Sequence, residues 1–202
     1  LSASLVAVFQ YDVKRMLAYS SVAQIGYMLL GIGLASTTGV GAAILHIFNH
    51  ALMKGALFLA LGAVACRIGA VTLRDFAGLG RRMPWTMAAI AIGGLSLIGV
   101  PPTAGFVSKW YLVLATLEQG LWPVAVLILI GSLLALVYVW RLIEAAYFET
   151  VAKNAPKVPE APASMLVPVW ILVAANLYFG INTDISVGAA MQAATMLMGA
   201  GG

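Results

Sequence analysis

Long runs of apolar residues constrain this sequence more than any other feature. Such runs lie at about 16–35, 42–66, 122–147 and 164–182, and a longer one lies at about 83–118. A run of about 20 apolar residues can cross a bilayer as a helix, and a helix satisfies its own backbone polar groups in lipid. We therefore predict an all-α, polytopic bundle of transmembrane helices, formed by a single membrane region over 1–202.

The composition supports the lipid bilayer as the main solvent. Hydrophobic residues make up 62% of the chain and charged residues 9%, whereas about a quarter of the residues in a soluble domain are charged. The net charge is +4, but no basic cluster is interleaved with aromatic residues, so no nucleic-acid partner is expected. Cys66 is the only cysteine, which excludes an internal disulfide and a cysteine metal site.

The run at 83–118 contains two adjacent prolines and can be interpreted in two ways. It is either two short helices or one crossing broken near 100–103, because proline removes a backbone donor and disfavours helix in the residue before it. Short cytoplasmic loops are enriched in Lys and Arg, and this rule favours a single crossing. With one crossing, nine cations between the apolar runs or near their ends share one side: Lys14, Arg15, Arg67, Arg74, Arg81, Arg82, Arg141, Lys153 and Lys157.

The resulting topology has five complete crossings, preceded by the end of another helix at about 1–9. It places the basic loops in the cytoplasm and the segment after Ile181 outside a cell (inner) membrane. Because the chain starts within a helical segment, we interpret it as the C-terminal part of a longer protein.

Two lysines remain inside apolar runs, Lys54 and Lys109. A lysine at the bilayer centre costs about 2.5–3.5 kcal/mol on insertion scales and is retained mainly where it faces a bundle interior or a water-filled path. Snorkelling to an interface is the alternative, but Lys54 has about a dozen apolar-run residues on either side. Both lysines are therefore functional candidates.

His46, His50 and Lys54 follow an i, i+4, i+8 spacing, which stacks them on one face of a helix. Imidazole titrates near neutral pH, so the row suits proton transfer, with Asn49 as a hydrogen-bonding neighbour. A histidine in a membrane helix can also serve helix packing, and two histidines at this spacing can bind zinc. No Asp, Glu or Cys stands nearby to complete a zinc site, so no metal is expected.

The helix break is the second candidate feature, with Gly99, Pro101, Pro102 and Gly105 around it. Unwound backbone at membrane depth is tolerated only where protein or a water-filled cavity satisfies it, and broken helices mark ion paths in transporters. A simple proline kink is the alternative. Near the end of the 122–147 run, Glu144 follows Arg141 by one turn; we expect a local ion pair there, with proton entry as the other role for Glu144.

Three motifs resemble one known family. They are DVKRMLAYSS at 12–21, HIFNHALMK at 46–54 and PPTAGFVSK at 101–109. They resemble the proton-conducting antiporter-like subunits, which include the D-type subunits of Mrp-type cation/proton antiporters, the L, M and N subunits of respiratory complex I and their relatives in membrane-bound hydrogenases. The resemblance extends to about residue 182 and implies the second five-helix repeat, with its broken helix, plus a final transmembrane helix.

The resemblance also implies roles for individual residues. Lys54 would be the central relay lysine, His50 and His46 its neighbours, and Lys109 the terminal residue facing the outlet. The M-type subunits carry Glu at the position of Lys109. Many members have a histidine within 20–24, where this chain has Gln24, which can bond water but cannot take up a proton at neutral pH.

The function implied is proton translocation in a multisubunit Na⁺/proton antiporter, together with other membrane subunits. One alternative is a proton-pumping subunit of a complex I-like NADH dehydrogenase or hydrogenase, and another is a structural subunit without transport. No motif for quinone, flavin or iron–sulfur binding is recognised, so no cofactor is expected, and any redox enzyme chemistry would lie in partner subunits.

The topology can be tested with single cysteines at the Lys157 and Ala200 positions in a Cys66→Ser background. An impermeant thiol reagent applied to intact cells should label the Ala200→Cys variant and spare Lys157→Cys. Labelling of Lys157→Cys from outside would mean that 83–118 crosses twice, and the interpretation as one broken helix would then be wrong.

Overall fold

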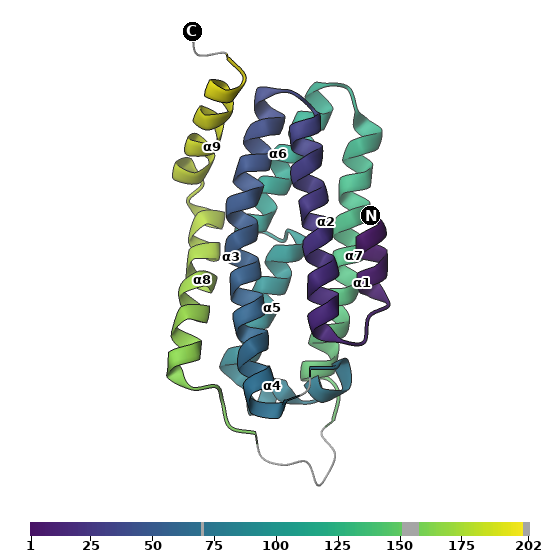
Figure 1. Cartoon of the computed structure of the whole chain (residues 1–202), viewed down its shortest axis with the longest axis vertical. Coiled ribbons are helices and arrows are strands. Elements are labelled where there is room, and N and C mark those ends of the chain that lie inside the picture. Colours follow the sequence, from purple (N-terminus) through teal and green to yellow (C-terminus); the bar gives the residue numbers. More distant parts are fainter. Residues whose placement is uncertain (70, 151–157, 200–202) are drawn as a thin grey trace.

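The computed structural model describes residues 1–69, 71–150 and 158–199, which form a bundle of long helices (Figure 1). The all-α prediction is confirmed. Lys153, Lys157 and Ala200, used in the topology argument, lie outside the described residues. The helices are α1 (Ser2–Val8), α2 (Val13–Gly33), α3 (Thr37–Ile68), the 3₁₀ helix η1 (Leu73–Phe76), α4 (Leu79–Arg82), α5 (Pro84–Ile98), α6 (Ala104–Glu118), α7 (Trp122–Tyr147), α8 (Ala163–Ile181) and α9 (Asp184–Leu197).

Four of the described helices, α2, α3, α7 and α8, are long and apolar enough to cross a membrane. The chain is therefore a multi-pass membrane protein. Helices α5 and α6 have 15 residues each and lie end to end across the break, α5 in the lower and α6 in the upper half of the view (Figure 1). Together they supply the length that one crossing needs.

The centre of the bundle is α3, which packs against α2, α5, α6, α8 and α9. Its inward face carries small residues, including Ala56, Ala60 and Ala63, each with no exposed surface. Small residues allow close helix approach in membranes, where packing replaces the hydrophobic effect between helices. This central position lets side chains of α3 reach most of the surrounding helices.

Helices α2 and α3 begin earlier in the sequence than the apolar runs predict, because the side chains that cap them lie upstream of those runs. Helix α2 begins at Val13, where the Asp12 carboxylate accepts from Arg15 N at 2.9 Å. Helix α3 begins at Thr37, where Ser36 Oγ accepts from Gly39 N at 3.1 Å. Both caps satisfy backbone donors that lack partners within a helix. Hydropathy alone does not register such polar caps.

Helix α9 differs from the sequence-based expectation, which places the segment after Ile181 in a tail. It lies in line with α8 along α3 (Figure 1), and its 14 residues are too few for a separate span. Ala190 and Ala194 are buried on its inner face. Gly41 of α3 makes room for this helix, since a Cβ there would lie 2.4 Å from Met191 Sδ.

The expected ion pair between Arg141 and Glu144 is not present in the described part of the chain. Arg141 instead donates to Val8 O and, at 3.5 Å, to Gln10 O. These carbonyls lie at the end of α1 and just beyond it, where the last turn of a helix leaves acceptors without intrahelical partners. Glu144 is exposed. The Arg141 guanidinium therefore binds the end of α1 and does not pair with Glu144 on its own helix.

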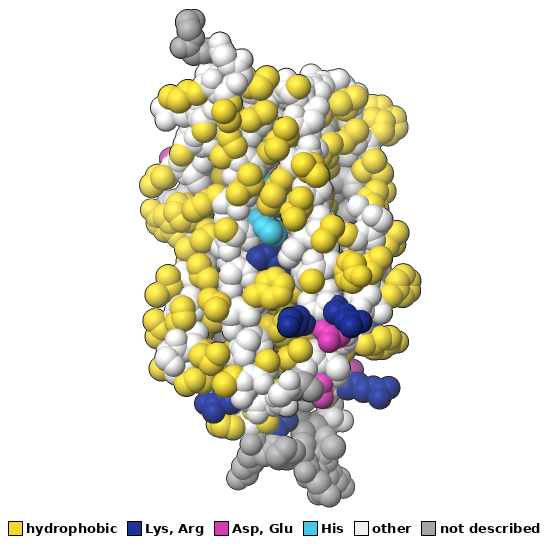
Figure 2. Space-filling model, in the orientation of Figure 1, with side chains coloured by type: hydrophobic (Ala, Val, Ile, Leu, Met, Phe, Trp, Pro, Cys, Tyr) yellow, Lys and Arg dark blue, Asp and Glu magenta, His cyan; other side chains and the backbone are white. Residues whose placement is uncertain are grey.

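Cationic side chains gather toward the α4 end of the bundle, the lower end in Figure 2. At this end the start of α2 pairs with the start of η1, through Val13 N to Val71 O and Leu73 N to Tyr11 O, both 2.9 Å. The side of the membrane on which this end lies stays a prediction.

Glu160 caps α5 from the segment that precedes α8. Its carboxylate accepts from Trp85 N at 2.8 Å and from Thr86 Oγ at 2.6 Å, and its carbonyl accepts from Arg67 at 2.7 Å. A negative charge at a helix N-terminus is favourable, because the amides there are unpaired and the helix dipole is positive.

Glu160→Ala should therefore lower the stability of the protein by about 1–2 kcal/mol. Thermal unfolding of the purified protein in detergent measures this. The matched control is Glu149→Ala, because Glu149 is exposed and its side chain forms no hydrogen bond or ion pair with another described residue. Equal midpoints for Glu160→Ala and the wild type would show that the cap adds nothing.

Candidate functional site

The predicted row on α3 lies inside the bundle. Lys54 is 5% exposed, His46 is 2% exposed and His50 is half-buried. The two imidazole rings stack with centroids 6.3 Å apart. Figure 2 shows a histidine and a Lys or Arg side chain near mid-height, among hydrophobic side chains and white atoms. In this view the other Lys and Arg side chains lie below them.

Lys54 is bound by α2. Its Nζ donates to Leu17 O at 2.9 Å and to the Ser20 hydroxyl, and lies 5.7 Å from the centroid of the Phe58 ring. All these partners are neutral. An ammonium held by dipoles, without a carboxylate, can release its proton without leaving an unpaired anion behind.

His46 connects three helices. Its Nε2 lies 3.1 Å from Gln24 Oε1 on α2, and its Nδ1 lies 2.8 Å from Ser108 Oγ on α6. Gln24 cannot carry a proton, but its amide oxygen accepts from Nε2, which leaves Nδ1 to accept from the Ser108 hydroxyl. A second proton on this imidazole would therefore lie on Nδ1, the ring atom that faces Ser108, the residue before Lys109.

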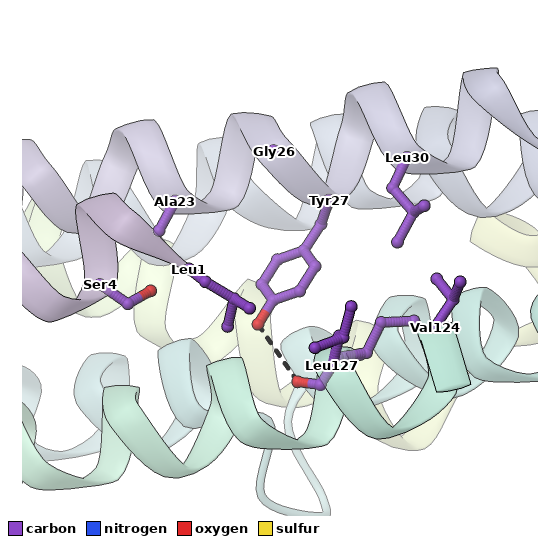
Figure 3. A pocket seen from close by; sticks show the side chains of 9 residues that line it. Leu1, Ser4, Ala23, Gly26, Tyr27, Leu30, Val124 and Leu127 are labelled. Atoms are coloured by element: carbon purple, nitrogen blue, oxygen red, sulfur yellow. Dashed lines mark hydrogen bonds between the residues drawn. The ribbon is translucent and has the colours of Figure 1, made fainter. Parts of the chain in front are cut away.

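Tyr27 of α2 lies between His46 and Lys109. Its ring meets the His46 ring edge-on at 5.8 Å and lies 5.1 Å from Lys109 Nζ. The hydroxyl donates to Ile128 O at 3.3 Å (Figure 3). Gly131 leaves room for it, since a Cβ there would lie 2.2 Å from the hydroxyl oxygen. The same ring borders a cavity of about 190 Å³ between α1, α2 and α7.

Lys109 is bound by the end of the broken helix. Its Nζ donates to Leu97 O at 2.8 Å, to Ile98 O at 2.9 Å and to Ser132 Oγ at 3.1 Å. The two carbonyls belong to the last turn of α5, where helix geometry provides no internal donor and the dipole is negative. The break thus supplies the partners of a lysine that is 6% exposed.

The break itself depends on glycines. Gly99 ends α5 in the left-handed region at φ +92°, which glycine adopts without steric cost. The bond between Pro101 and Pro102 is cis, and α6 begins at Ala104. A Cβ at Gly105 would lie 1.9 Å from Ser96 O, so α5 and α6 approach closely only because residue 105 is glycine.

The structure thus brings together Lys54, His50, His46, Gln24 and Lys109, while Glu144 lies elsewhere. Asn49 contacts the break, where it donates to Ala104 O at 2.7 Å. Sequence reasoning missed these polar partners: Ser20, Tyr27, Ser108, Ser132 and Asn176. Hydroxyls and amides are common in membrane helices, so no local pattern distinguishes them. Across the described ranges, no three His, Cys, Asp or Glu side chains gather as metal ligands.

These features define a polytopic membrane protein with a broken helix and a buried row of protonatable side chains. Residues 1–135 match the family described as NADH:quinone oxidoreductase/Mrp antiporter, TM, and the chain belongs to this family. The resemblance drawn from the three motifs is thereby confirmed.

Individual relatives carry different names. The chain is 42% identical over 196 residues to NADH-quinone oxidoreductase subunit N of Desulforudis audaxviator, which covers 91% of this chain and 39% of that protein. It is 32% identical over 178 residues to the D-type subunit of an Na(+)/H(+) antiporter of Alkalihalophilus pseudofirmus, covering 88% and 36%. A chain in the solved Mrp complex from Dietzia sp. superposes with a TM-score of 0.89 at 26% identity, covering 98% and 45%. The chain thus spans less than half the length of each of these three relatives.

Proposed function

We propose that the chain translocates protons across the membrane as a subunit of a larger complex. The observation that carries the proposal is a pair of buried lysines, each bonded to neutral groups, at the two ends of a histidine pair. Burying two unpaired charges costs several kcal/mol on any scale, so a purely structural subunit gains nothing from them. Membership of the family supports the same conclusion.

The path runs along α3 from Lys54 through His50 to His46 and continues to Ser108 and Lys109 on α6. The described residues include no hydrogen bond between the two imidazoles, whose ring centroids lie 6.3 Å apart, so water has to complete that step. Unwound backbone beside a half-helix end attracts such water. Exit occurs at Lys109, where the α5 carbonyls stabilise the protonated form.

The driving partner is proposed from the relatives. The 42% identity to a protein named NADH-quinone oxidoreductase subunit N favours a redox-driven complex, with the redox chemistry in other subunits. The Na⁺/proton antiporter is the second candidate, supported by the D-type antiporter subunit at 32% identity and by the fold of the Mrp complex. Purification of the intact complex with identification of its subunits separates the two. The basic loops are proposed to be cytoplasmic in either case.

Lys54→Met should abolish proton translocation and leave membrane insertion intact, because it removes the buried charge and keeps a long, unbranched side chain. Proton flux into vesicles reconstituted with the complex measures the effect. Lys14→Met is a matched control, since Lys14 is exposed at the start of α2. Normal flux in Lys54→Met would eliminate the relay role.

Lys109 and the break should act as one unit. Replacing Pro101 and Pro102 with Ala should allow the helix to close, withdraw the α5 carbonyls from Lys109 and slow transport, although no ionisable group is removed. Lys109→Glu should be less damaging than Lys109→Ala, because a carboxyl can still exchange a proton. Flux is compared at equal protein content. Wild-type flux in the double Ala variant would show a passive kink, and equal loss in both Lys109 variants would show that titration there is unimportant.

A further inference from the structure

Amide side chains from two different helices bind both backbone polar groups of Ala104, the first residue of α6. Asn176 of α8 accepts from Ala104 N at 3.2 Å, and Asn49 of α3 donates to Ala104 O at 2.7 Å. All three residues have no exposed surface. The first N–H of a helix has no intrahelical acceptor, so Asn176 performs the task of an N-cap from a distant helix.

The backbone of Ala104 fixes the orientation of both amides. An N–H can only donate, so Asn176 must present its oxygen, and a carbonyl can only accept, so Asn49 must present its nitrogen. Asn176 Oδ1 also accepts from the Ser96 hydroxyl at 2.9 Å, and Ser96 Oγ accepts from Gly105 N at 3.2 Å. Because Ser96 belongs to α5, Asn176 connects the two halves of the broken helix.

Helix α8 is shaped for this contact at a second position. Gly180 follows Asn176 by one turn, and a Cβ there would lie 2.1 Å from Pro102 O and 2.5 Å from Thr103 C. Only a residue without a side chain allows α8 to lie against the cis-proline segment at this distance. The face of α8 that carries Asn176 and Gly180 is therefore fitted to the break.

Each amide also keeps one polar atom free of described partners. Asn49 Oδ1 offers an acceptor and Asn176 Nδ2 offers a donor, on the two sides of Ala104. Buried polar atoms of this kind bind water. His50 Nε2, on the residue after Asn49, is also free of described partners and extends the polar surface toward the row on α3.

We propose that Asn176 and Asn49 form an amide clamp, a pair of positioning residues that holds the helix break open and hydrated. By fixing Ala104 against α3 and α8, the clamp sets where α6 starts and therefore keeps Lys109, five residues further on, at the α5 carbonyls. Helix α8 is then a working part of the path. The consequence for transport rests on the proposed function, but the geometry of the clamp does not.

Hydrogen–deuterium exchange of the assembled complex tests the clamp without reference to transport. In Asn176→Leu the Ala104 and Gly105 amides should exchange about tenfold faster, because their acceptors are lost or displaced. Asn176→Asp retains an oxygen acceptor of the same shape, so exchange should stay near the wild-type rate. Asn182→Leu, the same chemical change at an exposed position just beyond α8, should leave the break unaffected.

Proton flux in vesicles then tests the role of the clamp. Asn176→Leu should reduce flux at least fivefold and Asn176→Asp should restore most of it, a rescue that simple packing of α8 would not produce. If Asn176→Leu does not assemble, Ser96→Ala removes one partner of Asn176 and should give faster exchange at Gly105 with a smaller loss of flux.

Unchanged exchange at Ala104 and Gly105 in Asn176→Leu, or in Ser96→Ala where that variant replaces it, would overturn the clamp. Fast exchange with normal flux would overturn its link to transport. Loss of flux in both Asn176 variants, with normal exchange in Asn176→Asp, would show that the acceptor oxygen of residue 176 does not determine the flux. That result would also overturn the link between the clamp and transport. A failed proposal of proton translocation is recognised separately, by normal flux in Lys54→Met.

Discussion

Two lysine side chains have to be accommodated inside a membrane bundle without carboxylate partners in the described part of the chain, and much of the structure follows from this constraint. Lys54 finds its acceptors on the neighbouring helix α2, which presents the Leu17 carbonyl and the Ser20 hydroxyl. Lys109 requires more, because intact helices have few carbonyls to spare in lipid. The interruption between α5 and α6 supplies them, at the place where the second charge needs acceptors.

The interruption in turn has to be supported, because every helical hydrogen bond it removes leaves a polar group in an apolar environment. The support comes from neighbours rather than from the break itself. Asn176 replaces the lost acceptor of Ala104 N, and Asn49 adds a donor to Ala104 O. The glycines at 105 and 180 permit the close contacts around this residue. The central helix α3 thus carries both the protonatable row and one part of this support.

The sequence is sufficient for features whose signal is local. A lysine among apolar residues, two histidines spaced by one helical turn and adjacent prolines all stand out without knowledge of their surroundings, so both lysines, both histidines and the break can be found. Partners brought from other helices cannot, because Tyr27 or Asn176 looks ordinary in its own segment. The same reason explains Arg141, which binds carbonyls at the end of α1 in place of the nearest acid in sequence. Helix α9 escapes prediction because it continues a neighbouring helix instead of forming a full span.

The contact between Tyr27 and Gly131 has an evolutionary consequence. The phenol occupies the space that any side chain at 131 would need, with only 2.2 Å between its oxygen and an added Cβ. A substitution at either position changes which residues the other position can accept, although the two positions are far apart in the sequence and belong to different helices. A smaller residue at 27 would release position 131 to carry a side chain, whereas a tyrosine at 27 requires glycine at 131. We therefore expect the two positions to change together.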